Sequence, residues 1–97
     1  MKVFISQPMK DRSEDNIREE RQKVINELVA VGHTVVDSVI SKPEGKLKNE
    51  SVYMLGESIK LMSSADAVFF MNGWRKARGC RLEHDICKEY DIKIIND

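Results

Sequence analysis

The chain has 97 residues, of which 41% are hydrophobic and 33% are charged, and its formal net charge is zero. This length fits one small domain spanning residues 1–97, with the composition of a soluble globular protein rather than a disordered one. A neutral chain has no global field to attract a nucleic acid polymer or an anionic membrane, so anion binding requires a local cluster. The apolar runs are too short to span a bilayer, and no signal-peptide h-region follows Met1, so we expect a cytoplasmic protein.

The first third of the chain predicts a strand followed by a helix. The run Lys2–Ser6 (KVFIS) is apolar and rich in β-forming residues, which is typical of a strand. The segment Gln7–Ser13 contains a proline and ends at a serine suited to cap a helix. Apolar residues then recur at helical spacing through Glu14–Val31, with charges on the outer face, and Gly32 ends this predicted helix.

The middle of the chain predicts a strand, a loop and a second helix. The segment His33–Val39 (HTVVDSV) has the composition of a strand. The polar segment Ile40–Glu50, which contains Pro43 and Gly45, is expected to be a loop. Within Ser51–Met62 the apolar residues fall on one side of a helical projection, which indicates a helix.

The last third begins with Ala65–Met71 (ADAVFFM), a continuous apolar run that suits a strand buried on both faces of a parallel sheet. A loop is predicted at Asn72–Ala77, a third helix at Arg78–Tyr90 and a last strand at Ile92–Ile95. The resulting β-α-β-α-β-α-β order predicts an α/β fold. We expect a single flavodoxin/Rossmann-like domain, with a parallel four-stranded sheet and helices on both faces. Ligands of such sheets bind at the carboxyl ends of the strands.

Two cysteines, Cys80 and Cys87, lie in the third predicted helix. Seven residues of helix separate them by roughly 10 Å of rise, which is too far for a disulfide between them. Their number and spacing match no zinc motif, so we expect two small, partly buried thiols and no metal site.

Glu83 is the one charged residue on the inward arc of this helix. With Leu82 placed at zero on a wheel of 100° per residue, Glu83 falls at about 100°. The other residues on the inward arc are Gly79, Cys80, Ile86, Cys87 and Tyr90. The residues on the outward arc are Arg78, Arg81, His84, Asp85, Lys88 and Glu89. An inward carboxylate is costly unless it is paired or lines a cavity, so Glu83 is either a functional group or part of a structural ion pair with Arg75, Arg78 or a partner subunit.

Other candidates for ligand binding lie in the loops at the same sheet edge. Backbone N–H groups and arginines of the basic loop can hold a phosphate; the alternative is a solvated basic loop. This loop contributes Gly73, Trp74, Arg75, Arg78 and Gly79. Ser6 and Gln7, with Arg12 and Ser13, offer a second set of donors or, alternatively, ordinary turn chemistry and helix capping.

Of four further side chains, two have a functional and a structural interpretation each, and the two histidines have only a structural one. Trp74 can stack on a base or ribose, or it can serve packing or an interface. Asp66 is a candidate binding residue at the start of the third strand; the alternative is an edge residue that terminates the second helix. His33 and His84 are expected to be solvated, because neither has a metal-ligand partner at useful spacing.

The segments FISQPM, ADAVFFMNGW and RGCRLEH resemble the nucleoside 2-deoxyribosyltransferase superfamily, most of all its small bacterial and phage branch. The resemblance covers most of the chain in element order. It implies that Glu83 attacks the anomeric carbon of deoxyribose, and that the glycosyl-enzyme then passes the sugar to another base or to water. It implies no cofactor and no metal.

Two positions depart from the pattern of that superfamily. Its tyrosine in the first strand, which orients the nucleophile, corresponds to Phe4 here. Its aspartate in the helix before the third strand, which contacts the sugar or assists the base, corresponds to Ser58, with Glu57 beside it. The nucleophile is therefore retained while its usual helpers are replaced.

Three functions follow. The first is a nucleoside or nucleoside 5′-monophosphate N-glycosidase or 2-deoxyribosyltransferase that uses Glu83 as its nucleophile. The second is a non-catalytic nucleotide-binding module on the same fold, which the changes at Phe4 and Ser58 favour. The third is an interaction protein in which Glu83 pairs with cations within a dimer. A small sheet with exposed edges makes a homodimer the expected assembly, with a small nucleoside or nucleotide as the partner molecule.

Overall fold

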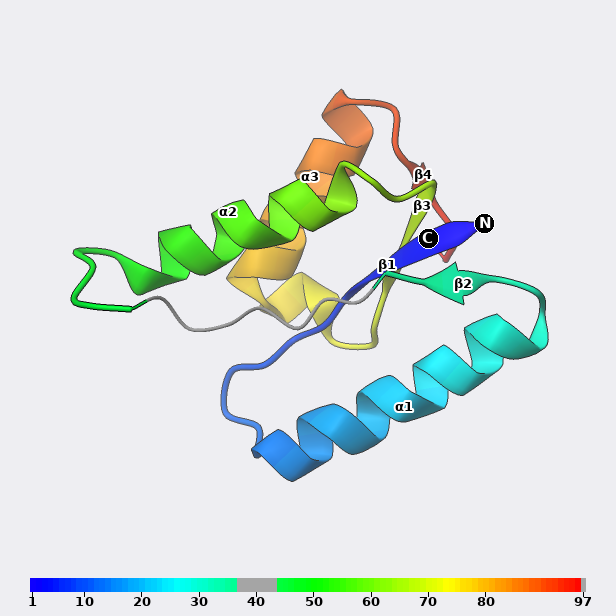
Figure 1. Ribbon diagram of the computed structural model, residues 1–97, viewed down its shortest axis with the longest axis horizontal. Coiled ribbons are helices and arrows are strands. Elements are labelled where there is room, and N and C mark those ends of the chain that lie inside the picture. Colours follow the sequence, from blue (N-terminus) through cyan, green and yellow to red (C-terminus); the bar gives the residue numbers. More distant parts are fainter. Residues whose placement is uncertain (37–43, 97) are drawn as a thin grey trace.

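A computed structural model describes residues 1–36 and 44–96 of the protein. Within these residues, four strands alternate with three α-helices, and a short 3₁₀ helix, η1, precedes the last helix (Figure 1). The strands are β1 (Lys2–Ser6), β2 (Thr34–Val35), β3 (Ala67–Phe70) and β4 (Lys93–Ile94). The helices are α1 (Glu14–Ala30), α2 (Glu50–Met62), η1 (Trp74–Lys76) and α3 (Arg78–Glu89). The predicted β-α-β-α-β-α-β order is confirmed.

The four strands form one parallel sheet in the order β2-β1-β3-β4. The longest pairing joins β1 to β3, with Val3 opposite Ala67 and Ser6 opposite Phe70. The chain leaves β1 toward β2 on one side and leaves β3 toward β4 on the other. The crossovers therefore diverge between β1 and β3, which is the switch point where ligands bind in sheets of this type.

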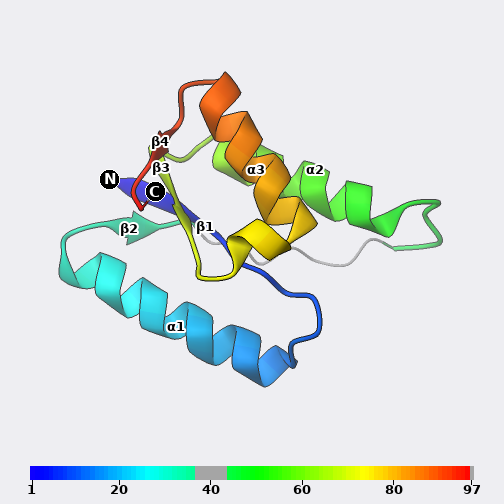
Figure 2. The ribbon, with the colours of Figure 1, turned by 180° about the vertical axis from the view of Figure 1, so that it is seen from behind.

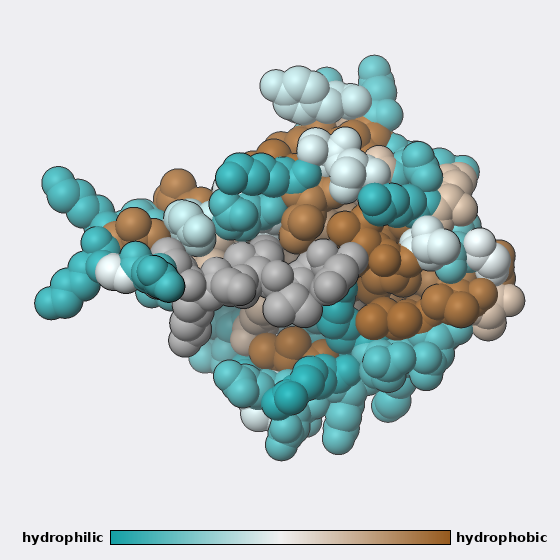
Figure 3. Space-filling model, in the orientation of Figure 1, coloured by the Kyte–Doolittle hydropathy of each residue, from teal (hydrophilic) through white to brown (hydrophobic). Residues whose placement is uncertain are grey.

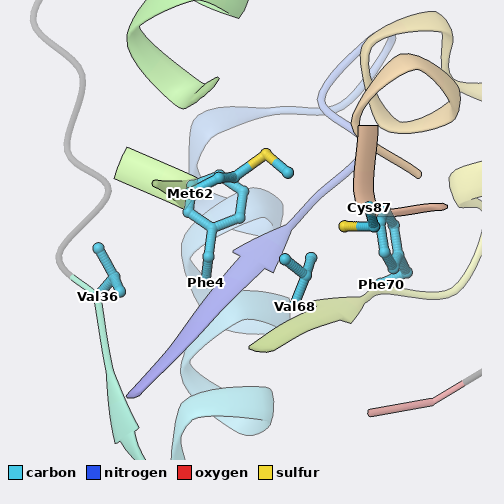
Figure 4. Packing of buried hydrophobic residues seen from close by; sticks show 6 residues of the cluster. All are labelled: Phe4, Val36, Met62, Val68, Phe70 and Cys87. Carbon is cyan, nitrogen blue, oxygen red and sulfur yellow. The ribbon is translucent and has the colours of Figure 1, made fainter. Parts of the chain in front are cut away.

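Helix α1 covers one face of the sheet, and α2 and α3 cover the other (Figures 1 and 2). Alternation along β1 divides its side chains between these faces. Val3 and Ile5 pack with Leu28 of α1, whereas Phe4 packs with residues of α2 and α3. The cluster around Phe4 consists of Val36, Met62, Val68, Phe70 and Cys87 (Figure 4). Side chains on the face of Phe4 thus point toward α3.

Capping and exposure agree with the expected helices. The Ser13 hydroxyl accepts a hydrogen bond from the backbone N–H of Asn16 and caps α1, as predicted. Asn49 caps α2 in the same way, through the backbone N–H of Val52. The surface over α1 is mostly hydrophilic (Figure 3), in line with its charged outer face. Amphipathic periodicity therefore predicted both helices, although Val31 and Val52, apolar residues at their ends, are 71% and 61% exposed.

The two outer strands are shorter than predicted. Strand β2 has two residues, and 37–39 of the predicted strand lie outside the described residues, as does the loop segment 40–43. Beyond β4, Asn96 uses its side chain amide to bond both the N–H and the C=O of Phe70, at 2.9 and 2.6 Å. A side chain thus satisfies backbone groups at the end of β3. No helix in the described residues is both long and apolar enough to cross a membrane.

Candidate functional site

Glu83 lies on the inner side of α3, as the helical wheel predicted. Its side chain faces the sheet, and the residue is only 6% exposed. The Ser6 hydroxyl, at the carboxyl end of β1, donates a hydrogen bond of 2.8 Å to Glu83 Oε1. Ser6 follows Phe4 by two residues and so shares its α3-facing side of the strand. Strand alternation and the helical period together place this pair beside the switch point between β1 and β3.

Burial dominates the electrostatics of this carboxyl group. It raises the pKa of Glu83 to about 7, while the hydrogen bond from Ser6 acts in the opposite direction. Among the described residues Glu83 forms no ion pair, so the alternative of a structural pair with Arg75 or Arg78 does not hold. The alternative of a pair with a partner subunit stays a prediction. A carboxyl group with this pKa exists in both protonation states near neutral pH. It is suited to act as a nucleophile or in proton transfer.

Two buried thiols flank Glu83 on the same arc of α3. Burial raises the pKa of Cys80, with a smaller opposing effect of Ser6, and it raises the pKa of Cys87 to about 11. The negative charge of Glu83 adds to both increases. Both cysteines are free, as predicted, and both remain protonated thiols at neutral pH. The described residues contain no group of three His, Cys, Asp or Glu side chains arranged to hold a metal ion.

Gln7 and Arg12, in the turn after β1, have structural partners. The buried Gln7 donates from Nε2 to the carbonyl of Ile17, at 2.8 Å, and so ties the end of β1 to α1. Its Oε1 has no hydrogen-bond partner among the described residues. The guanidinium of Arg12 pairs with Glu20 of α1. The structural alternative, turn chemistry and helix capping, therefore explains the contacts of Gln7 Nε2 and Arg12. Gln7 Oε1 remains a buried acceptor beside Ser6 in the sequence.

The loop after β3 folds into η1 and carries Trp74 back over α3. Gly73 permits this turn because its φ of 90° lies in the left-handed region. The Trp74 indole stacks on the His84 ring with centroids 4.2 Å apart, and it lies 5.2 Å from the Phe70 ring. The expectation that His84 is solvated was wrong, because this turn covers it and leaves it 6% exposed. The packing interpretation of Trp74 is confirmed for the side of its ring that faces His84.

The basic residues of the loop line a hollow on the outer side of α3. Its volume is about 480 Å³. The lining residues are Trp74, Arg75, Arg78, Arg81, Leu82, His84, Asp85 and Lys88. Neither Ser6 nor Glu83 is among them. The structure thus separates the inward carboxylate from the cations that precede it in the sequence.

A second, larger hollow of about 1170 Å³ lies at the carboxyl edge on the α1 side. Residues of the turn after β1, of α1 and of the segment from Phe69 to Ala77 line it, together with Asn96. Gly73, Trp74 and Arg75 therefore line this hollow, whereas Ser6 and Glu83 do not. Most candidate residues of the sequence thus fall into two groups, the buried pair of the Ser6 hydroxyl with the Glu83 carboxylate and the linings of two solvent-facing hollows.

A family model described as a domain of unknown function (DUF4406) matches residues 1–96. The chain belongs to the DUF4406 family. Among curated proteins and among solved structures, no significant match to the chain was found.

Three candidate residues of this DUF4406 chain lie apart from the Ser6–Glu83 pair. Asp66 accepts a hydrogen bond of 2.8 Å from the backbone N–H of Lys2, so it sits at the amino edge of the sheet, opposite the switch point. Ser58 is half-buried on α2, and the neighbouring Glu57 pairs with Lys60 at 3.0 Å. Gly79 is exposed in the first turn of α3 with open space around it. Asp66 directly precedes β3, and a residue that precedes a strand of a parallel sheet lies at the amino edge of that sheet. Its position in the sequence was therefore enough to exclude Asp66 from a site at the carboxyl edge.

Proposed function

We propose that this DUF4406 protein cleaves the N-glycosidic bond of a nucleoside or nucleoside 5′-monophosphate, with Glu83 as the nucleophile. One observation carries the proposal: a buried carboxyl group without a cation partner in the described chain is held by Ser6 beside the β1–β3 switch point. Burying an ionisable carboxyl group costs free energy. No ion pair among the described residues offsets this cost, so a structural ion pair within the chain does not explain why Glu83 is buried. The resemblance to nucleoside 2-deoxyribosyltransferases supports the same assignment of Glu83.

The proposed reaction has two displacement steps. The ionised Glu83 carboxylate attacks C1′ of the sugar, and the bond from C1′ to the base nitrogen breaks with its electron pair leaving on the base. The departing base takes up a proton from solvent, and the nucleophile of the second step returns one to solvent. Water or a second base then attacks C1′, which breaks the ester bond to Glu83 and regenerates the carboxylate. Because Ser6 donates to Oε1, the other carboxylate oxygen is the one left for attack.

In this proposal, Ser6 orients the nucleophile in place of the tyrosine of the superfamily that the sequence resembles. The position of that tyrosine is Phe4, whose ring packs in the core cluster. Ser6 lies one side-chain repeat further along the same face of β1 and brings a hydroxyl to the carboxylate. In this proposal the orienting hydroxyl has moved along the strand while the nucleophile has kept its place on α3.

The test is release of free base from a panel of deoxynucleosides and their 5′-monophosphates. We expect release by the natural protein, loss of release in Glu83→Gln, and unchanged release in the matched control Glu89→Gln, which alters an exposed carboxylate of the same helix. Intact-mass analysis of a quenched reaction should show one deoxyribosyl group on the natural protein and none on Glu83→Gln. Equal background rates in the natural protein and Glu83→Gln would remove the proposal.

The second candidate is a nucleotide-binding module without turnover. The observation that favours it is the separation of the basic and aromatic residues from Glu83 into hollows of their own. Calorimetry with the same panel distinguishes the two, because saturable binding without base release supports the module. A cytoplasmic location and a homo-oligomeric state complete the proposal. Sedimentation at two protein concentrations tests the second of these.

A further inference from the structure

The hollow on the outer side of α3 concentrates positive charge on a protein with no net charge. Its lining holds four basic side chains, Arg75, Arg78, Arg81 and Lys88, against the single carboxylate of Asp85. A local excess of this kind creates a positive potential that attracts an anion even though the whole chain is neutral.

The cations on α3 form one stripe along the helix. Arg78, Arg81, Asp85 and Lys88 follow one another at intervals of three or four residues, which places them on a common face. No ion pair in the described part of the chain joins Asp85 to the cations on either side of it. Arg78 and Lys88 have no hydrogen bond or ion pair with any described residue. Their charges are therefore available to a ligand.

The other two arginines are held in place by the η1 turn. The Arg75 guanidinium lies 5.0 Å from the centre of the Trp74 ring, within the range of a cation–π contact. Arg81 donates from Nη1 to the Arg75 carbonyl at 3.1 Å, which links α3 to the turn. These contacts orient two of the guanidinium groups before a ligand arrives, which reduces the entropy lost on binding.

Aromatic side chains also line the hollow. Trp74 and His84 are stacked there, and Leu82 of α3, 42% exposed, adds an apolar wall. Cations beside an apolar lining suit a small molecule that carries a charged group beside an apolar or flat part. Arginine forks bind the oxygens of a phosphate in a bidentate way, and the higher charge of a phosphate or pyrophosphate suits a site with several cations.

We infer that this hollow on the outer side of α3 is a binding site for the phosphate or pyrophosphate group of a small molecule. The site is separate from the Ser6–Glu83 pair, since neither residue lines the hollow. Its volume of about 480 Å³ holds a ligand of mononucleotide size. Arg78 and Lys88 bind the anion, and Arg75 and Arg81 shape the wall beside it.

The protein contains one tryptophan, and it lines both this hollow and the one on the α1 side, so intrinsic fluorescence reports binding at either. Of the two hollows, Arg78 and Lys88 line only the one on the outer side of α3, so their variants distinguish the two. We expect pyrophosphate, and more weakly inorganic phosphate, to change Trp74 fluorescence in a saturable way that weakens as salt is added. Arg78→Gln and Lys88→Gln should each weaken pyrophosphate binding roughly tenfold, because each removes a charged partner of the anion. The matched control Lys46→Gln changes an exposed lysine outside the hollow and should leave the affinity unchanged.

Glu83→Gln separates this site from the proposed reaction. It should abolish base release and leave the pyrophosphate affinity unchanged. The inference is overturned if pyrophosphate gives no saturable response up to about 10 mM, a limit weaker than ordinary ligand affinities. It is equally overturned if Lys46→Gln weakens binding as much as Arg78→Gln. Circular dichroism of each variant checks that the fold is retained.

Discussion

The pH dependence of stability tests whether Glu83 is a buried carboxyl group without a charged partner. Its pKa is about 7 in the folded protein, against 4.5 for the ordinary group. One pKa unit corresponds to about 1.4 kcal/mol, so ionisation of the folded protein costs about 3 kcal/mol more than ionisation of the unfolded chain. We expect the Glu83→Gln variant, which keeps the shape of the side chain without its charge, to lose this cost.

The sign follows from proton binding. Between pH 4.5 and pH 7 the folded protein retains the Glu83 proton, and the unfolded chain has released it. The folded state therefore binds more protons, and the free energy of unfolding contributed by Glu83 falls as pH rises through this window. Above the folded pKa both states are ionised, and the contribution levels off at its lowest value.

Urea titrations at several pH values between 4 and 8 measure this effect. The natural protein and the Glu89→Gln control should lose about 3 kcal/mol across the window relative to Glu83→Gln, after the common contribution of the other groups is subtracted. The matched control changes an exposed carboxylate on the same helix. Parallel curves for the natural protein and Glu83→Gln would refute the burial argument, because they would mean that the carboxyl group titrates alike in both states.

Three further predictions address the surroundings of this group. Ser6→Ala removes the donor to Glu83 Oε1, so it should raise the pKa of Glu83 further and lower the free energy of unfolding at pH 8 by about 1–3 kcal/mol. Urea unfolding measures this loss, and an unchanged midpoint would contradict the hydrogen bond. Gly73→Ala places a side chain on a residue with a φ of 90° and should lower the free energy of unfolding by about 1 kcal/mol. Gly79→Ala lies in the open first turn of α3 and should be neutral or stabilising. Thermal melts of both variants measure the difference, and equal losses would contradict the role of Gly73 in the turn. Cys80 and Cys87 should react with a thiol reagent only after unfolding, since both are buried protonated thiols, and rapid labelling of the native protein would contradict their placement.

Periodicity in the sequence was sufficient to predict the layers of the fold and the direction of Glu83. Each residue along β3 and β1 is buried or faces a particular side because of its position in the strand. The pattern of apolar residues therefore repeats along the whole strand and can be recognised without knowledge of the tertiary structure. The wheel placed Glu83 inward for the same reason. It placed Tyr90 inward as well, but α3 ends at Glu89 and Tyr90 is 76% exposed. Helix ends break the periodicity on which the wheel depends.

The contacts that define the site have no local signal. Ser6 and Glu83 are 77 residues apart, and only the pairing of β1 with β3 and the packing of α3 bring them together. The stack of Trp74 on His84 depends on the left-handed Gly73 and on a single 3₁₀ turn. No hydrophobic period encodes a turn of that length, so the wheel alone left His84 facing solvent.

The arrangement on α3 explains how a carboxyl group can keep a pKa near 7 while arginines surround it in the sequence. Arg81 and Asp85 lie within two residues of Glu83 but project to the solvent-facing side of the helix, where water and salt screen their charges. Glu83 experiences mainly its own desolvation and the hydroxyl of Ser6. An anion bound to the outer stripe would therefore leave the titration of Glu83 nearly unchanged. The two sides of α3 thus support two independent chemistries, a proton-exchanging carboxyl group toward the sheet and an anion site toward the solvent.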